Sequence, residues 1–187
     1  GWNTLVEEAE VTAKASKSYL PANNEKLRPR TIASIAQTKV ERLATGIREF
    51  DRVLGGGVVP GSLVLLGGTP GIGKSTILLD AGLRFGQQGI KVLYVSGEES
   101  EEQTAMRAVR LGGAQSNDNL LILTATDLDD ILAQANALKP QLLIIDSIQT
   151  MYNPELQTAA GSVGQVRECT AKLLQFAKST GIAVLLI

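Results

Sequence analysis

The sequence predicts an α/β fold, in which helices flank a parallel, twisted sheet. Short, continuous apolar runs recur along the chain, and they alternate with stretches in which apolar residues have helical spacing. Continuous apolar runs are typical of parallel strands, because helices cover such strands on both faces. A glycine-rich segment directly after the first run and short connections between elements point the same way. With 187 residues the chain can form one such domain with an appendage.

The composition excludes several classes of function. The net charge of −1 at pH 7 carries no electrostatic signature of a nucleic-acid partner. Histidine is absent, which excludes His-based catalysis, and the single Cys169 excludes an internal disulfide and a Cys-rich zinc site. No apolar run approaches the ~20 residues that a membrane span needs. The first residues do not resemble a signal peptide. We therefore expect a soluble, cytoplasmic protein.

Residues 1–40 are predicted to be an N-terminal arm or linker, and residues 41–187 the folded core. Apolar residues are sparse in the arm and lack a sustained period, and Pro21 and Pro29 interrupt it. Such a segment cannot bury enough surface to fold alone, so we expect a short helix at most. A disordered tail is the alternative interpretation.

The elements of the core can be placed in order. Residues 45–54 are expected to form a short helix with Thr45 as its N-cap, and Pro60-Gly61 then turns the chain into the first strand, 63–66. Later helices are expected at about 75–88, 100–111 and 126–138, the last with Thr126 as its N-cap, and beyond about 161. The other strands are expected at 92–95, 120–123 (a short edge strand), 142–145 and 182–187. A final strand normally has structure beyond it, so the core is expected to be incomplete at its C-terminal end.

The glycine-rich segment between the first strand and the next helix matches the phosphate-binding pattern G-x-x-x-x-G-K-[ST] at every fixed position. Its glycines let backbone N–H groups surround an anion, and the helix that follows adds the positive end of its dipole. Lys74 would reach the β- and γ-phosphates, and the Ser75 hydroxyl would complete the shell of a bound Mg²⁺. A glycine-rich turn that binds nothing is the alternative. The predicted nucleotide-binding residues are Gly68, Thr69, Pro70, Gly71, Ile72, Gly73, Lys74, Ser75 and Thr76.

Carboxylates follow two later strands. Asp146 ends the run 142–145, and an acidic residue at this place downstream of such a loop holds Mg²⁺ through water. The alternative is an Asp that caps a turn. Glu98 and Glu99 follow the run 92–95, at the edge where α/β sheets collect ligands. One of them could orient and deprotonate the water that attacks the γ-phosphate, although both could simply begin the next helix.

Several of these segments together resemble the RadA (Sms) family of bacterial DNA-repair ATPases, which are relatives of RecA and of hexameric replicative helicases. The resemblance covers nearly the whole chain. It rests on the glycine-rich loop and on five further segments, at residues 2–8, 45–57, 95–100, 143–150 and 154–168. Thr69 departs from the family, whose members often have Asp or Asn there.

The resemblance implies a RecA-like ATPase that binds ATP or ADP with Mg²⁺, forms a homo-hexameric ring on single-stranded or branched DNA, and promotes branch migration beside a RecA-type recombinase. By position, Glu98 would be the catalytic carboxylate, Glu99 could assist it, and Lys74 would act with them. Residues 150–164 would face DNA. The family's four-cysteine zinc module would precede Gly1, so no zinc is expected in this chain. A lysine- and arginine-bearing motif and a Lon-protease-like domain would follow Ile187. If this chain carries its own transition-state cation, Arg107, Arg110 and Arg167 are the candidates.

Two alternatives of other classes stay open. In the first, ATP builds a ring that recruits partners, and hydrolysis only resets the assembly. In the second, the protein is a KaiC-like ATPase that phosphorylates itself, because that family also has a Glu-Glu pair after this strand.

Overall fold

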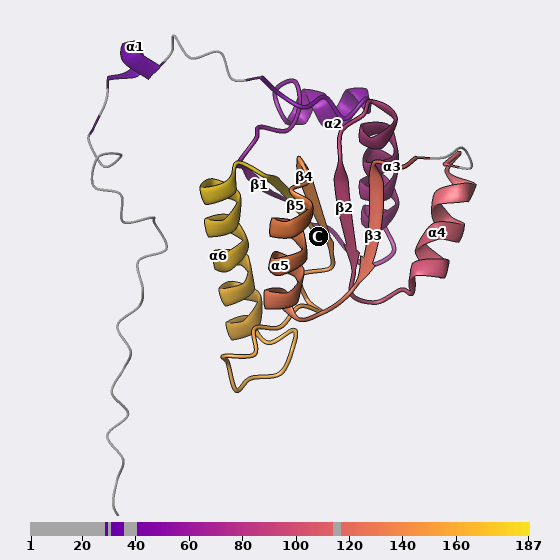
Figure 1. Cartoon of the computed structure of the whole chain (residues 1–187), viewed down its shortest axis with the longest axis vertical. Helices are drawn as coiled ribbons and strands as arrows, with labels where there is room; N and C mark the ends of the chain where they lie inside the picture. The colour runs from indigo at the N-terminus through magenta and orange to yellow at the C-terminus, as the bar shows by residue number, and fades with distance from the viewer. Residues whose placement is uncertain (1–28, 30, 36–40, 114–116) are drawn as a thin grey trace, which may run out of the picture.

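The structure is a computed structural model, and it describes residue 29 and residues 31–35, 41–113 and 117–187. Its centre is a five-stranded sheet in the order β1-β5-β4-β2-β3, with every pair of neighbours parallel (Figure 1). The expected α/β fold with a parallel sheet is therefore confirmed. The strands are β1 (Leu63–Leu65), β2 (Val92–Ser96), β3 (Leu120–Thr124), β4 (Leu142–Asp146) and β5 (Ala183–Leu186). The helices are α1 (Ile32–Ile35), α2 (Arg48–Val53), α3 (Lys74–Gln87), α4 (Glu101–Arg110), α5 (Leu128–Leu138) and α6 (Val163–Thr180).

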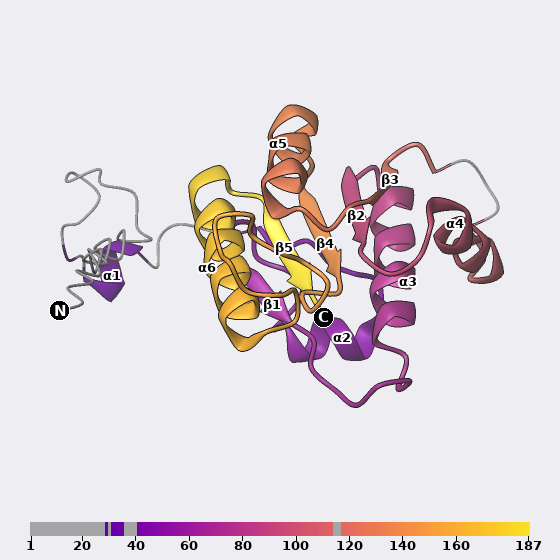
Figure 2. The same ribbon diagram turned by 90° about the horizontal axis from the view of Figure 1, so that it is seen from below.

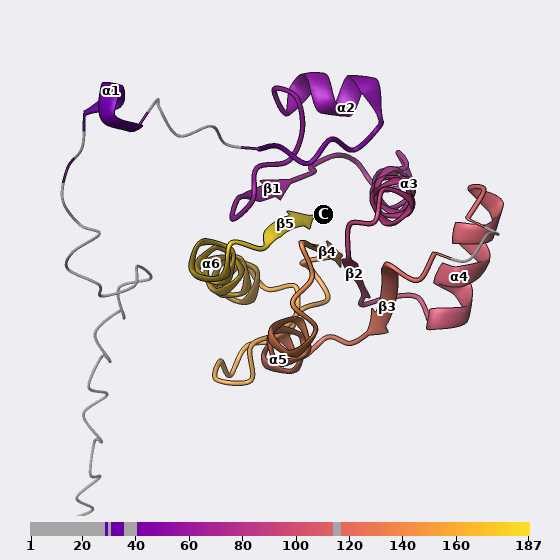
Figure 3. The same ribbon diagram turned by 45° about the horizontal axis from the view of Figure 1, so that its top comes forward.

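The helices cover the two faces of the sheet, as Figures 2 and 3 show. Helices α5 and α6 lie on one face, where they pack on Val95, Ile145 and Val184. Helices α2, α3 and α4 lie on the other, where Tyr94 and Ile144 are buried. Successive strand residues point to opposite faces, so β2 and β4 supply both cores. This explains why the two strands are apolar up to their last residues, Ser96 and Asp146. The short strand expected at 120–123 is β3, which pairs with β2 and is the last strand in the sheet order of the described residues.

Two helix starts differ from the sequence prediction. Thr45 is not an N-cap, because α2 begins at Arg48 after Ile47. The buried Thr45 hydroxyl instead donates to Asp51 Oδ1, and the same carboxylate accepts from the backbone N–H groups of residues 45 and 46. Helix α5 is capped by Asp127 and not by Thr126, since the Asp127 carboxylate accepts from two backbone N–H groups of the first turn. At α5 a carboxylate thus takes the capping role expected of a threonine hydroxyl, whereas no side chain caps α2.

The N-terminal arm falls mostly outside the described residues. Within it the structure describes α1, a four-residue helix in which every residue is exposed, and residues 29 and 31, which belong to no helix or strand. The division into an arm and a core at residue 40 therefore stays a prediction.

A two-residue bridge fixes the chain segment that enters the core. Leu43 and Val58 exchange backbone hydrogen bonds of 2.8 Å in each direction. Gly57, beside this bridge, has a φ of +131°, and a Cβ built on it would lie 2.5 Å from the Leu43 carbonyl oxygen. We expect Gly57→Ala to lower the free energy of unfolding by about 2–4 kcal/mol, because the backbone there cannot move without breaking the bridge.

Urea unfolding measures this effect, and Gly89→Ala is the matched control. Gly89 has a φ of +79° but open space where a Cβ would be, so its substitution costs only the left-handed backbone strain of about 1–2 kcal/mol. Equal destabilisation by the two substitutions would show that the contact with Leu43 contributes nothing.

Candidate functional site

The candidate site lies where three parallel strands end. The phosphate-binding loop follows β1, the Glu98-Glu99 pair follows β2, and Asp146 is the last residue of β4. Strands β2 and β4 are neighbours, and their register pairs Ser96 with Asp146. The fold therefore brings the segments of all the predicted site residues to the C-terminal ends of the strands. This edge of the sheet is where open α/β sheets bind ligands.

The backbone of the loop is exposed and strongly turned. Every residue from Gly67 to Gly73 is exposed. Gly71 and Gly73 have φ angles of +78° and +98°, and Gly73 is the residue directly before α3. No side chain caps this 14-residue helix, so its first N–H groups remain available to an anion at the loop. Lys74 begins α3, and its Nζ donates to the carbonyl oxygens of Gly68 and Thr69 at 2.8 and 2.9 Å. The ammonium group is thus held directly over the loop.

Ser75 and Asp146 meet across the edge of the sheet, although 71 residues separate them in the chain. The Ser75 hydroxyl donates to Asp146 Oδ1 at 3.0 Å. The other carboxylate oxygen, Oδ2, accepts a hydrogen bond of 2.5 Å from the hydroxyl of Tyr94. Burial of the phenol, followed by the negative charge of Asp146 and this hydrogen bond, raises the pKa of Tyr94 far above its ordinary value. Tyr94 therefore stays a neutral donor.

The two glutamates have different surroundings. Glu98 is exposed, and its Oε1 accepts a hydrogen bond of 3.1 Å from the hydroxyl of Ser147, which directly follows Asp146. Glu99 turns toward α4, where its carboxylate forms an ion pair of 2.5 Å with Arg107. Burial by itself lowers the pKa of Arg107, but the hydrogen bond with Glu99 and nearby negative charges raise it overall. Only Glu98 therefore reaches toward the Asp146 side of the site.

Three residues of this network were not singled out for these contacts by the sequence analysis: Tyr94, Arg107 and Ser147. Arg107 was named only as a possible transition-state cation, and its pairing with Glu99 could not be foreseen. A signal for Tyr94 existed, since it carries the one hydroxyl inside the otherwise aliphatic run 92–95. A tyrosine in a strand that is covered on both faces needs a hydrogen-bond partner, and the polar end of a neighbouring strand is the nearest place to find one.

The residues at this edge fit a magnesium ion that is bound with a nucleotide. A serine hydroxyl and a carboxylate are oxygen ligands, which Mg²⁺ prefers, and this ion usually takes few protein ligands beside phosphate oxygens and water. In the part of the chain that the structure describes, no group of three or more His, Cys, Asp or Glu side chains is placed so that it could hold a metal ion. A metal here would accordingly depend on Ser75, Asp146 and the phosphates.

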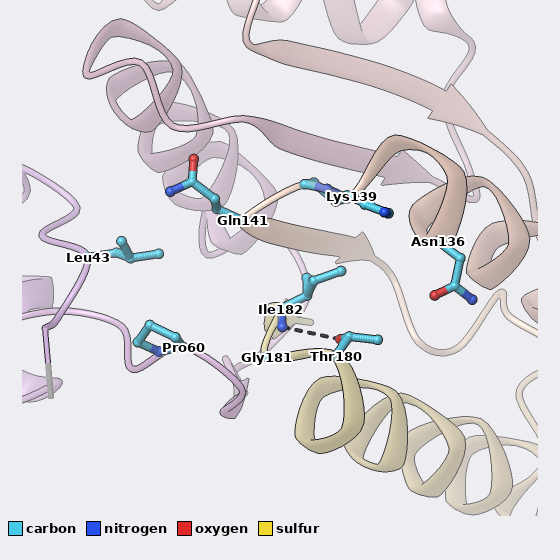
Figure 4. Close-up of a pocket in the computed structure, with 9 residues that line it drawn as sticks. Leu43, Pro60, Asn136, Lys139, Gln141, Thr180, Gly181 and Ile182 are labelled. Atoms are coloured by element: carbon cyan, nitrogen blue, oxygen red, sulfur yellow. Dashed lines mark hydrogen bonds between the residues drawn. The ribbon is translucent and has the colours of Figure 1, made fainter. Parts of the chain in front are cut away.

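Two hollows differ in their relation to this edge. A groove of about 620 Å³ between α3 and α4 begins at Gly73 and Thr76 and continues past Ile77 and Asp80 to Arg110, so it adjoins the loop. A cavity of about 440 Å³ lies at the opposite ends of β4 and β5, lined by Leu43, Pro60, Lys139 and Ile182 among others (Figure 4). None of the predicted site residues lines this second cavity.

The parallel sheet, the glycine-rich loop and Asp146 together define a P-loop ATPase domain of RecA-like α/β architecture. A family model described as an AAA domain matches residues 28–187, and the chain belongs to this family. Along its whole length it is similar to proteins named DNA repair protein RadA. It is 48% identical over 187 residues to the one from Halalkalibacterium halodurans, 45% over 188 to that of Bacillus subtilis and 44% over 196 to that of Escherichia coli.

The resemblance to the RadA family is thus confirmed. Each of these three alignments covers 100% of this chain but only 40 or 41% of the relative, so the chain spans about two fifths of the length of these proteins. Among the helices in the described ranges, none is long and apolar enough to cross a bilayer.

Proposed function

We propose that this chain is the ATP-binding and ATP-hydrolysing core of a DNA-repair protein similar to RadA. The observation that carries the proposal is the convergence of Ser75, Asp146 and Glu98 at the edge of the sheet where the P-loop also lies. A general nucleotide-binding turn needs the loop alone. The added carboxylates supply the groups that hydrolysis needs, namely one for the metal and one for water.

In this proposal the P-loop amides and Lys74 bind the phosphates and neutralise charge on the β–γ bridge as it breaks. Glu98 accepts a proton from a water molecule while the water oxygen forms a bond to the γ-phosphorus, and ADP leaves with the bridging oxygen. Mg²⁺, when bound, neutralises phosphate charge. Ser75 would ligate it directly, and Asp146 would hold its water ligands. The hydroxyl of Ser147 would keep Glu98 on the Asp146 side of the site.

We further propose a ring on DNA, because the relatives are named as DNA-repair proteins and the resemblance implies a hexamer. The expected DNA-facing segment 150–164 leaves β4 next to the site and is mostly exposed from residue 154 onward. Its base is held by the buried Gln165, which bonds to the backbone of Asn153 and Thr158. Glu155 is the only charged residue in this segment. Contacts with DNA would therefore come from backbone amides and polar side chains.

The KaiC-like alternative is less well supported than hydrolysis, because the two glutamates do not act as a pair here. Arg107 holds Glu99, so a single carboxylate is left for water. The assembly alternative differs from the motor only in what hydrolysis drives. ATPase activity with and without single-stranded DNA tests all three, and it is best measured on residues 1–187 and on a longer chain. DNA-stimulated phosphate release supports the motor, unstimulated release the assembly protein, and phosphate on Ser or Thr residues the KaiC-like enzyme.

Asp146→Asn tests the metal role. The asparagine keeps the size of the side chain but loses the negative charge that attracts the hydrated ion. We expect tight nucleotide binding to need roughly tenfold more Mg²⁺, while binding in EDTA stays unchanged. Titration calorimetry with ADP at several Mg²⁺ concentrations measures both values. An unchanged magnesium requirement would return Asp146 to a turn-capping role.

A further inference from the structure

We propose that Tyr94 is a positioning residue for the metal-binding carboxylate of Asp146. The inference rests on the proposed function, since it concerns how the nucleotide's Mg²⁺ is held. Tyr94 lies in the middle of β2, with 1% of its surface exposed, and its hydroxyl donates to Asp146 Oδ2. The two strands are neighbours, and Tyr94 is paired in register with Ile144, two residues before Asp146 on the same face.

Two hydroxyl groups donate hydrogen bonds to Asp146, and binding of Mg²⁺ and nucleotide would affect them differently. The first is Ser75, whose hydroxyl donates to Oδ1 and would turn to the metal when Mg²⁺ and nucleotide bind. The second is Tyr94, which has no place in the metal's shell and can keep its bond to Oδ2 throughout. In the bound state, the hydrogen bond from the Tyr94 hydroxyl would therefore fix the rotation of the Asp146 carboxylate. Oδ1 would then be free to hold water ligands of the metal.

The surroundings keep this donor in its donating form. The hydroxyl is buried between α3 and the sheet, and the charges that face it are the carboxylates of Asp146 and Glu99 and the guanidinium of Arg107. A phenol that donates to a carboxylate at the end of a strand resembles the outer partners that orient ligands in other metal sites. Their removal typically lowers metal affinity by about 10–100-fold.

Tyr94→Phe is the test, because phenylalanine preserves the ring that fills the core and removes only the hydroxyl. We expect half-maximal Mg²⁺-dependent binding of ADP to require roughly tenfold more Mg²⁺. Binding of ADP in EDTA should equal that of the wild type, since the loop and Lys74 are untouched. Thr180→Val is the matched control, because it also removes one hydroxyl and keeps the shape of the side chain. The Thr180 hydroxyl donates to the carbonyl oxygen of Phe176 at the end of α6, at the opposite ends of the strands, so both values should stay at wild-type levels.

The outcomes separate this inference from the proposed function. If wild-type protein binds ADP equally with and without Mg²⁺, the proposed metal site fails. If the wild type responds to Mg²⁺ and Tyr94→Phe responds identically, only the positioning role fails. If Tyr94→Phe lost ADP affinity equally in EDTA and in Mg²⁺, the hydroxyl would support the fold and not the metal. That result would also overturn the positioning role.

A double variant gives a second, independent test that holds even if Tyr94→Phe lowers stability. If Tyr94 acts through Asp146, adding Tyr94→Phe to Asp146→Asn should change the magnesium requirement by less than about twofold. Independent, multiplying effects of the two substitutions would overturn the proposal.

Discussion

Replacement of Lys74 with alanine is expected to slow ATP hydrolysis by at least about a hundredfold. The ammonium group lies over the loop, within 2.9 Å of the carbonyl oxygens of Gly68 and Thr69. With nucleotide bound, it would exchange these neutral acceptors for the charged phosphate oxygens. Charge on those oxygens is redistributed in the transition state, so the loss should fall on turnover and on binding together.

Steady-state phosphate release and calorimetry with ATP and Mg²⁺ measure the two effects. Lys91→Ala is the matched control, because it removes an exposed lysine directly before β2, at the opposite ends of the strands. Its turnover and affinity should stay within about twofold of the wild type, since an exposed charge so far away is screened by salt. Unchanged affinity together with unchanged turnover in Lys74→Ala would remove the loop from the proposed site.

The sequence predicts much of the phosphate-binding side of the site because that side is local. The loop, the strand before it and the helix after it are contiguous in the chain. Glycines at 71 and 73 indicate a left-handed backbone, and both have positive φ angles in the structure. Asp146 is likewise readable, as the polar residue that ends an apolar run. The places of the strands follow from the same runs, to within one or two residues.

What could not be predicted depends on register between strands that are distant in the chain. The order β1-β5-β4-β2-β3 places β2 beside β4, and only this pairing brings Tyr94 to Asp146 and Glu98 to Ser147. The two failed N-caps have separate causes. At α5 the carboxylate of Asp127, one residue after Thr126, bonds the free N–H groups of the first turn, and propensity ranks Asp and Thr alike as caps. At α2 the hydroxyl of Thr45 donates to Asp51, which lies inside the helix, and no side chain caps that helix.

Replacement of Glu98 with glutamine is expected to slow hydrolysis by about 10²–10⁴-fold while leaving nucleotide binding within about twofold of the wild type. The amide oxygen of glutamine can still accept the hydrogen bond from Ser147, so the side chain should keep its place. It cannot accept a proton from water at neutral pH. Loss of a general base of this kind costs about 10²–10⁴-fold in rate and no phosphate contact.

Glu99→Gln is the comparison that makes this result specific, since it changes the neighbouring carboxylate in the same way. Glu99 is joined to Arg107, and its substitution leaves a partly buried guanidinium without its charged partner. We therefore expect lower stability, by about 1–3 kcal/mol, and turnover that stays within about tenfold of the wild type. Thermal unfolding and single-turnover hydrolysis measure the two effects. If Glu99→Gln stopped hydrolysis and Glu98→Gln did not, the ion pair with Arg107 would have to open during turnover, and the roles of the two glutamates would be exchanged.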